Sequence, residues 1–285
     1  MKTKNLIIAS FMTIALFISC DSTDKTADTP TAISTEQVNA DAKIDASIND
    51  VSNIIEDQFL VKQSVTSKSG EKIKSILPAC ATVTWTLTNG DFTGSIDFGT
   101  VGCALDNGNV LKGKITLTFS GNFATPEQTI TYTFDEFYHN GKKLQGSKTI
   151  TRSLKSTELL ATAHPVFTCA VDMTVTFDDG SVYTRTENKV KEMVEGYDTL
   201  GNWDDNVFLV TGSGTTTMPN GDKLSSIIKT PLRYVMACKQ PFPVAGTVLK
   251  VKNDIETLVD FGNGDCDNLA TVTTGGVTTT IELKK

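Results

Sequence analysis

The sequence has few of the residues on which most enzyme classes depend. It contains two histidines, His139 beside a predicted turn and His164 before a proline, and both are expected in loops. It has no Gly-x-Ser-x-Gly elbow, no His-Glu-x-x-His pair and no Cys-x-x-Cys zinc spacing. These absences exclude the hydrolases and zinc enzymes that carry such signatures, and we expect no cofactor. A glycosidase needs only two carboxylates, so the 33 acidic residues leave that class open.

Positive charge is also scarce, with 26 Lys and Arg against 33 Asp and Glu and a net charge of −7. Removal of residues 1–19 as a signal peptide would take away two lysines and no acid and would change the net charge to −9. A strongly acidic chain is repelled by phosphate backbones and by anionic membrane surfaces. Nucleic acid is therefore excluded as the main partner.

The apolar run at the start of the chain is too short to cross a membrane. It covers residues 6–18, follows Lys2 and Lys4, and has 13 residues. A membrane span needs about 20 residues, whereas this length is typical of a secretory signal.

The end of that run resembles the lipobox of bacterial lipoproteins. Leu16-Phe17-Ile18-Ser19-Cys20 places a small residue directly before cysteine, although Phe17 stands where leucine or valine is usual. The resemblance implies cleavage before Cys20 and acylation of its sulfur and new amino group, and several acyl chains make a firm anchor. An ordinary signal peptide or an N-terminal anchor is the alternative.

A tether and a helix follow. Residues 20–33 are polar and are expected to stay disordered. Ser34 and Gln37 have the spacing of a capping box, and apolar residues then recur at helical intervals as far as Phe59. We expect a helical segment within 34–70 whose apolar stripe packs on a sheet or forms a stalk, with Asp41 and Asp57 on the opposite face.

The remainder, 71–285, reads as one β domain. Apolar and β-branched residues alternate with threonines, which is typical of strands. Five pairs favour tight hairpin turns: Asn89-Gly90, Asn140-Gly141, Asp179-Gly180, Asn220-Gly221 and Gly275-Gly276. Successive hairpins make an antiparallel meander of about 12 strands, whose apolar side needs a partner. We therefore expect an all-β sandwich or a partly closed barrel after one N-terminal helix.

A cysteine-containing motif occurs twice in this domain. Asp-Phe-Gly at 97–99 precedes Cys103, the same triplet at 260–262 precedes Cys266, and an Ala-Cys pair opens each hairpin at Cys80 and Cys238. With turns at 89–90 and 253–254, each cysteine pair falls near the open end of its hairpin, within reach of a disulfide.

We thus predict the bridges Cys80–Cys103 and Cys238–Cys266, which export would permit, and a free, buried Cys169. The alternative is that the four paired cysteines are only small buried apolar residues.

The mature chain resembles lipid-anchored, β-rich envelope proteins of Bacteroidetes-type bacteria. The resemblance rests on the lipobox-like start and on the Cys…Asp-Phe-Gly…Cys hairpins. It implies attachment to the cell envelope, with the outer membrane as the expected location, and it implies no activity.

The loop at 196–206 is the candidate binding surface. It combines Tyr197 and Trp203 with three acids, Asp198, Asp204 and Asp205. Aromatic faces beside carboxylates and amides suit sugar binding, and loops often carry such chemistry. The alternative is an ordinary hairpin end with both aromatic rings folded onto the core.

A weak calcium motif lies near the C-terminus. Asn263, Asp265 and Asp267 alternate like the start of an EF-hand loop, but Asn268 and Thr274 replace its glycine and its final glutamate. The pattern favours a turn whose side chains bond the local backbone, and we expect no metal site.

Two functional classes follow from these observations. The first is a lipid-anchored binding or structural module of the cell envelope that meets the membrane through its anchor and contacts an envelope protein or a glycan. The alternative is a hydrolase that cleaves an envelope or environmental polymer with paired carboxylates.

The lipid anchor gives the first prediction. Cys20→Ser removes the acylated sulfur, so the protein should move from the membrane fraction to the soluble fraction or remain uncleaved, as fractionation and mass measurement would show. Ser22→Ala, two residues away, should change neither property. Normal processing and membrane fractionation of Cys20→Ser would contradict the lipoprotein interpretation.

Overall fold

The computed structural model describes residues 32–67, 73–199 and 202–284. The chain begins with the helix α1 (Thr35–Ser67) and continues with strands. The first seven strands are β1 (Thr82–Thr88), β2 (Asp91–Asp97), β3 (Cys103–Ala104), β4 (Val110–Ser120), β5 (Glu127–His139), β6 (Lys142–Lys155) and β7 (His164–Thr176). The others are β8 (Val182–Glu195), β9 (Val207–Thr217), β10 (Lys223–Val235), β11 (Ala245–Lys252), β12 (Ile255–Asn263), β13 (Leu269–Thr274) and β14 (Val277–Glu282), with the 3-10 turn η1 (Met236–Cys238) before β11.

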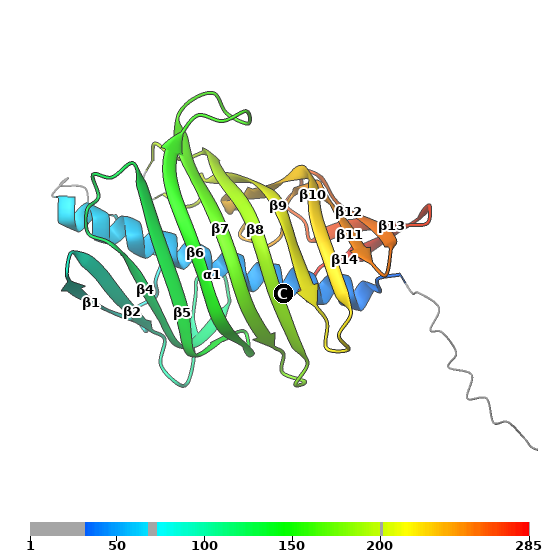
Figure 1. The fold of residues 1–285 in the computed structure, drawn as a ribbon, viewed down its shortest axis with the longest axis horizontal. Coiled ribbons are helices and arrows are strands. Elements are labelled where there is room, and N and C mark those ends of the chain that lie inside the picture. Colours follow the sequence, from blue (N-terminus) through cyan, green and yellow to red (C-terminus); the bar gives the residue numbers. More distant parts are fainter. Residues whose placement is uncertain (1–31, 68–72, 200–201, 285) are drawn as a thin grey trace, which may run out of the picture.

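The strands form one antiparallel sheet in chain order, from β1 to β14, with β3 paired to β4 beside this path. The predicted all-β meander with one N-terminal helix is confirmed. The sheet does not close into a barrel, and α1 runs across the strands along one face of the sheet (Figure 1). The helix therefore covers the apolar face that we expected a second layer of strands to cover.

Local signals placed the turns and the helix start correctly. Each of the five predicted turns joins two paired strands, and the Asn140-Gly141 pair has the positive φ values, 48° and 82°, of a tight hairpin turn. Ser34 and Gln37 form the capping box: the backbone N–H of Ser34 donates to Gln37 Oε1 at 3.1 Å, and that of Gln37 donates to Ser34 Oγ at 3.3 Å.

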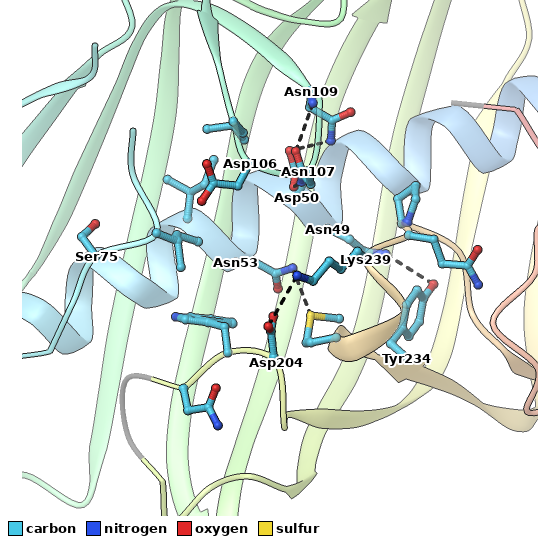
Figure 2. A pocket seen from close by; sticks show the side chains of 18 of the residues that line it. Asn49, Asp50, Asn53, Ser75, Asp106, Asn107, Asn109, Asp204, Tyr234 and Lys239 are labelled. Carbon is cyan, nitrogen blue, oxygen red and sulfur yellow. Dashed lines mark hydrogen bonds and ion pairs between the residues drawn. The ribbon is translucent and has the colours of Figure 1, made fainter. Parts of the chain in front are cut away.

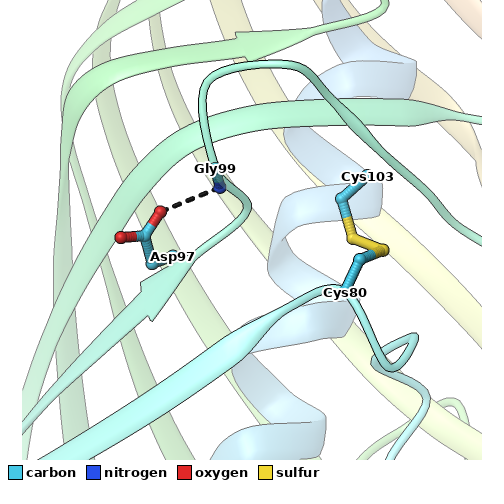
Figure 3. The surroundings of a disulfide bond; sticks show 4 residues. All are labelled: Cys80, Asp97, Gly99 and Cys103. Atoms are coloured by element: carbon cyan, nitrogen blue, oxygen red, sulfur yellow. Dashed lines mark hydrogen bonds between the residues drawn. A yellow bond between two sulfur atoms is a disulfide. The ribbon is translucent and has the colours of Figure 1, made fainter.

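Both copies of the cysteine motif contain a disulfide and the same hydrogen-bonded turn. The predicted pairings agree with the structure, with Cα atoms 5.8 Å apart for Cys80–Cys103 and 5.2 Å apart for Cys238–Cys266. In each copy the aspartate accepts a hydrogen bond from the glycine two residues later, at 2.8 Å in the first copy (Figure 3) and 2.9 Å in the second. Cys169 is free and buried.

Two apolar clusters lie between α1 and the sheet. One packs the middle of the helix, from Ile44 to Phe59, against β2 and β4 to β9. The other packs the helix start, with Val38, against β10 and β12 to β14. The helix therefore holds distant parts of the meander together.

The face of α1 opposite its apolar stripe is also buried, because the sheet supplies charged partners for it. Asp41 is 1% exposed, and it lies against Arg185, which is also 1% exposed. Arg185 donates to Asp41 at 2.8 Å, to Asp45 at 2.7 Å and to Glu187 at 3.1 Å. Lys189 bonds Asp45 at 3.0 Å and Glu187 at 2.8 Å.

Lys250 of β11 completes this group through an ion pair with Asp41. We call the six residues the ionic band: Asp41, Asp45, Arg185, Glu187, Lys189 and Lys250. Burial opposes ionisation of Asp41, but the charges of Lys250 and Arg185 outweigh it and hold the pKa of that carboxyl below its ordinary value. Burial likewise opposes ionisation of Glu187, yet Lys189 and Arg185 lower its pKa to about 2. The band is therefore ionised at neutral pH.

The ionic band gives the second prediction. Asp41→Ala should lower the free energy of unfolding by about 3–5 kcal/mol, because it leaves two buried cations short of a partner. Glu136→Ala, which removes an exposed partner of Lys143, should cost less than about 1 kcal/mol. Urea denaturation of both variants measures the difference, and equal costs would contradict the assignment.

The same residues set the response to acid. Because the pKa values of Asp41 and Glu187 are lower in the folded chain, their contribution is present above a pH of about 4.5 and is lost as the pH falls towards 2. The native protein should therefore lose stability over this interval, and Asp41→Ala should lose less.

Candidate functional site

A cavity of 380 Å³ opens between the middle of α1 and the loops at one end of the strands (Figure 2). Its polar wall is rich in carboxamides, which are Asn49, Asn53, Asn107, Asn109, Asn202 and Gln240. Asp50, Asp106, Asp204, Lys74 and Lys239 add charge, and Trp203 and Tyr234 add aromatic surface. Ile54, Ile76, Leu105, Met236 and Pro241 supply apolar surface, and Ser75 completes the wall.

Both disulfide-bonded segments contribute residues to this cavity. Leu105, Asp106, Asn107 and Asn109 come shortly after Cys103, and residues 239–241 follow Cys238 directly. The duplicated disulfides therefore fix two opposite parts of the wall, while α1 supplies Asn49, Asp50 and Asn53 between them. Residues separated by three or four positions lie on one side of a helix, which explains why Asn49 and Asn53 face the same space.

Asp50 links the part of the cavity wall that contains Asn107 and Asn109 to α1. Its carboxylate accepts hydrogen bonds from Asn107 Nδ2 at 2.7 Å and Asn109 Nδ2 at 3.1 Å (Figure 2). It also accepts one from His139 Nε2 at 2.9 Å. These three donors occupy much of the hydrogen-bonding capacity of the carboxylate. Asp50 is therefore a structural anchor of the cavity wall.

Asp50 is also the last member of a hydrogen-bonded series that runs from Ser47 through His139 to Asp50. Ser47 Oγ lies 3.1 Å from His139 Nδ1, and His139 Nε2 lies 2.9 Å from Asp50. A nucleophile must reach its substrate, but Ser47 is 1% exposed and donates to the backbone oxygen of Lys43 at 2.9 Å. The Ser47–His139–Asp50 series therefore docks α1 onto β5 and does not form a hydrolytic centre.

The expectation that both histidines lie in loops was wrong. His139 ends β5 and His164 begins β7, and both are buried. His164 is held by the Thr162 carbonyl at 2.7 Å and by Glu192 at 3.0 Å. Each histidine therefore has a partner on each ring nitrogen.

Hydrogen bonds fix the two aromatic side chains of the cavity wall, Trp203 and Tyr234. Trp203 Nε1 donates to Asp57 Oδ1 at 3.3 Å, and Asn49 Nδ2 donates to the Tyr234 hydroxyl at 3.3 Å. Burial raises the pKa of Asp57, although Ser75 and other donors oppose this rise.

An exposed ion pair and an unpaired amide complete that wall. Lys239 Nζ lies 3.6 Å from Asp204 (Figure 2). Among the residues described, Gln240 Nε2 is a buried donor that has no hydrogen-bond partner.

The predicted binding loop divides into two parts. Trp203 and Asp204 line the cavity, whereas Tyr197 packs against the main apolar cluster beside His164. Asp205 accepts hydrogen bonds from the Thr199 hydroxyl at 2.7 Å and from Asn202 at 2.8 Å, so it braces the loop. Asp198 is exposed and lies outside the cavity lining, and residues 200–201 lie outside the described part.

The calcium motif forms a local turn. Asp267 Oδ1 accepts from the backbone N–H of Leu269 at 3.1 Å, and Asp267 itself donates to the Asp265 carbonyl at 2.9 Å. Asn263 ends β12. Within the described ranges, no group of three or more His, Cys, Asp or Glu side chains is placed to hold a metal ion.

The anchor prediction falls on residues that the structure does not describe, since Cys20 and the segment before it lie within 1–31. Among the described residues, no helix is both long enough and apolar enough to span a membrane. Comparison of the chain with protein-family models, curated proteins and solved structures gives no match.

The division of the loop gives the third prediction. Tyr197→Ala should lower the free energy of unfolding by about 1–3 kcal/mol because it removes a ring from the apolar cluster. Asp204→Ala should change it by less than about 1 kcal/mol because the Asp204–Lys239 pair is exposed. Chemical denaturation compares the two, and a neutral Tyr197→Ala would contradict the placement of this ring.

Proposed function

We propose that the protein is a lipid-anchored binding module of the cell envelope and that a small polar ligand occupies the cavity beside α1. The observation that carries this proposal is the composition of the cavity, where fixed aromatic and apolar surfaces meet convergent carboxamides. Small-molecule sites combine these two elements in volumes of roughly 300–1,000 Å³. At 380 Å³, the cavity suits a ligand at the small end of this range.

The anchor belongs to this proposal through the sequence alone. Acylation of Cys20 would attach the chain to a membrane, and the described helix begins at Thr35. The residues between them reach at most about 50 Å when extended. The module would therefore act near the membrane surface, with the outer membrane as the proposed location.

The binding role is favoured over hydrolysis by the state of the carboxylates. A glycosidase needs one carboxyl group with a raised pKa as its acid. Burial raises the pKa of Asp57, but this carboxyl group lies outside the cavity lining. Asp50 is bonded by three donors, and Asp204 is paired with Lys239. These two carboxylates therefore suit positioning better than proton transfer.

The fourth prediction tests the cavity as the binding site. Asp106→Trp adds a large side chain to the cavity wall, whereas Thr118→Trp adds the same side chain to the exposed face of β4. A low-molecular-mass fraction of the envelope should raise the melting temperature of the native protein and of Thr118→Trp, because a ligand that binds only the folded state stabilises it. Asp106→Trp should lose this shift.

The outcome of the thermal-shift comparison is clear in either direction. An equal shift in all three proteins would place the ligand elsewhere. The absence of any shift in the native protein would contradict the binding role.

A further inference from the structure

We infer that the ligand of the cavity is an uncharged saccharide, with hydroxyl groups bound by the carboxamides and a ring face packed against Trp203. This inference rests on the proposed function and names its ligand class. It is carried by the hydrogen-bonding groups, the charge and the fixed aromatic surface of the cavity.

The hydrogen-bonding groups match hydroxyls. A carboxamide carries an acceptor and two donors in one plane, and a sugar hydroxyl both donates and accepts. Gln240 Nε2 is buried and has no hydrogen-bond partner among the described residues, so rotation of its amide towards the cavity would bring a donor to a ligand oxygen without breaking a bond within the protein. Asn49 uses its nitrogen on Tyr234, and Asn202 uses its nitrogen on Asp205. The oxygens of Asn49 and Asn202 are then available as acceptors.

The charges of the cavity disfavour a charged ligand. Asp50 and Asp204 already have cationic or amide partners, and Lys239 is paired with Asp204. An anion would lie near three carboxylates, and a cation would lie near Lys74 and Lys239. A charged group that leaves water without a partner loses free energy, so the balance favours an uncharged ligand.

The aromatic surface is held in place before a ligand arrives. The indole N–H of Trp203 is bonded to Asp57, and the Tyr234 hydroxyl is bonded to Asn49. A fixed ring offers apolar contact at little cost in conformational entropy. The C–H face of a pyranose is the apolar surface of a saccharide, and it fits such a ring.

Gln240 allows a test that separates binding from folding. Because its Nε2 has no partner within the part of the chain that the structure describes, Gln240→Leu should not lower the melting temperature. The same change should weaken saccharide binding about 3–10-fold, since one hydrogen bond to the ligand is lost. Thr118→Leu, on the exposed face of β4, should leave both properties unchanged.

Isothermal titration calorimetry of the full mature protein in detergent provides the measurement. The probes are neutral cello-, xylo-, malto- and chito-oligosaccharides, with uronic-acid and sialylated oligosaccharides as charged comparators. At least one neutral saccharide should bind, more tightly than every charged comparator, and Asp106→Trp should abolish this binding.

Three results would overturn the inference. They are failure of all neutral saccharides to bind, tighter binding of a charged one, and unchanged binding to Gln240→Leu or Asp106→Trp. If no saccharide binds but the envelope fraction still stabilises the native protein and not Asp106→Trp, the ligand class is wrong and the proposed function stands. If the fraction has no effect either, both fail.

Discussion

The ionic band between α1 and the sheet is the interaction on which the rest of this structure depends. Asp41 and Asp45 of the helix form ion pairs with three cations of the sheet. Arg185 and Lys189 belong to β8, and Lys250 belongs to β11. Buried charges of this kind gain little net stability as pairs, but removal of one partner is costly. The band therefore acts mainly as a constraint: it permits one position of the helix on the sheet.

That constraint explains how an open sheet of this size can be stable and can carry a site. The two apolar clusters pack α1 against different strands, β2 and β4 to β9 in one and β10 and β12 to β14 in the other, so the helix joins strands that are far apart in the meander. Once the helix is fixed, Asn49, Asp50 and Asn53 lie between the two disulfide-bonded segments. The cavity is therefore a consequence of helix docking, and the disulfides hold the walls on each side of it.

The sequence predicted the features that depend on neighbouring residues. The capping box at Ser34, the hairpin turns and the two cysteine pairings all follow from short spacings, and the structure has all of them. The burial of both helix faces could not be predicted in this way, because Asp41 meets Arg185 across 144 positions. A strand that points Arg185, Glu187 and Lys189 into the core also breaks the rule that polar residues face solvent.

The candidate site was predicted only in part for the same reason. Trp203 and Asp204 were recognisable from the composition of their loop, whereas no sequence pattern singled out Asn49 and Asn53. The helix sequence did contain a sign of burial, since several polar residues in its middle have short side chains, among them Ser47, Asn49 and Ser52. Long charged side chains are the usual choice for a solvated face, so their absence there could have indicated burial.

Native-state hydrogen exchange of α1 tests the central claim most directly. If the ionic band fixes the helix in the sheet, the amides from Asp41 to Asp57 should exchange only through global unfolding, with the same free energy and denaturant dependence as those of β6 to β8. Exchange of the helix amides at a much lower free energy, with the strands still protected, would show that α1 leaves an intact sheet. That result would contradict the account of both the fold and the cavity.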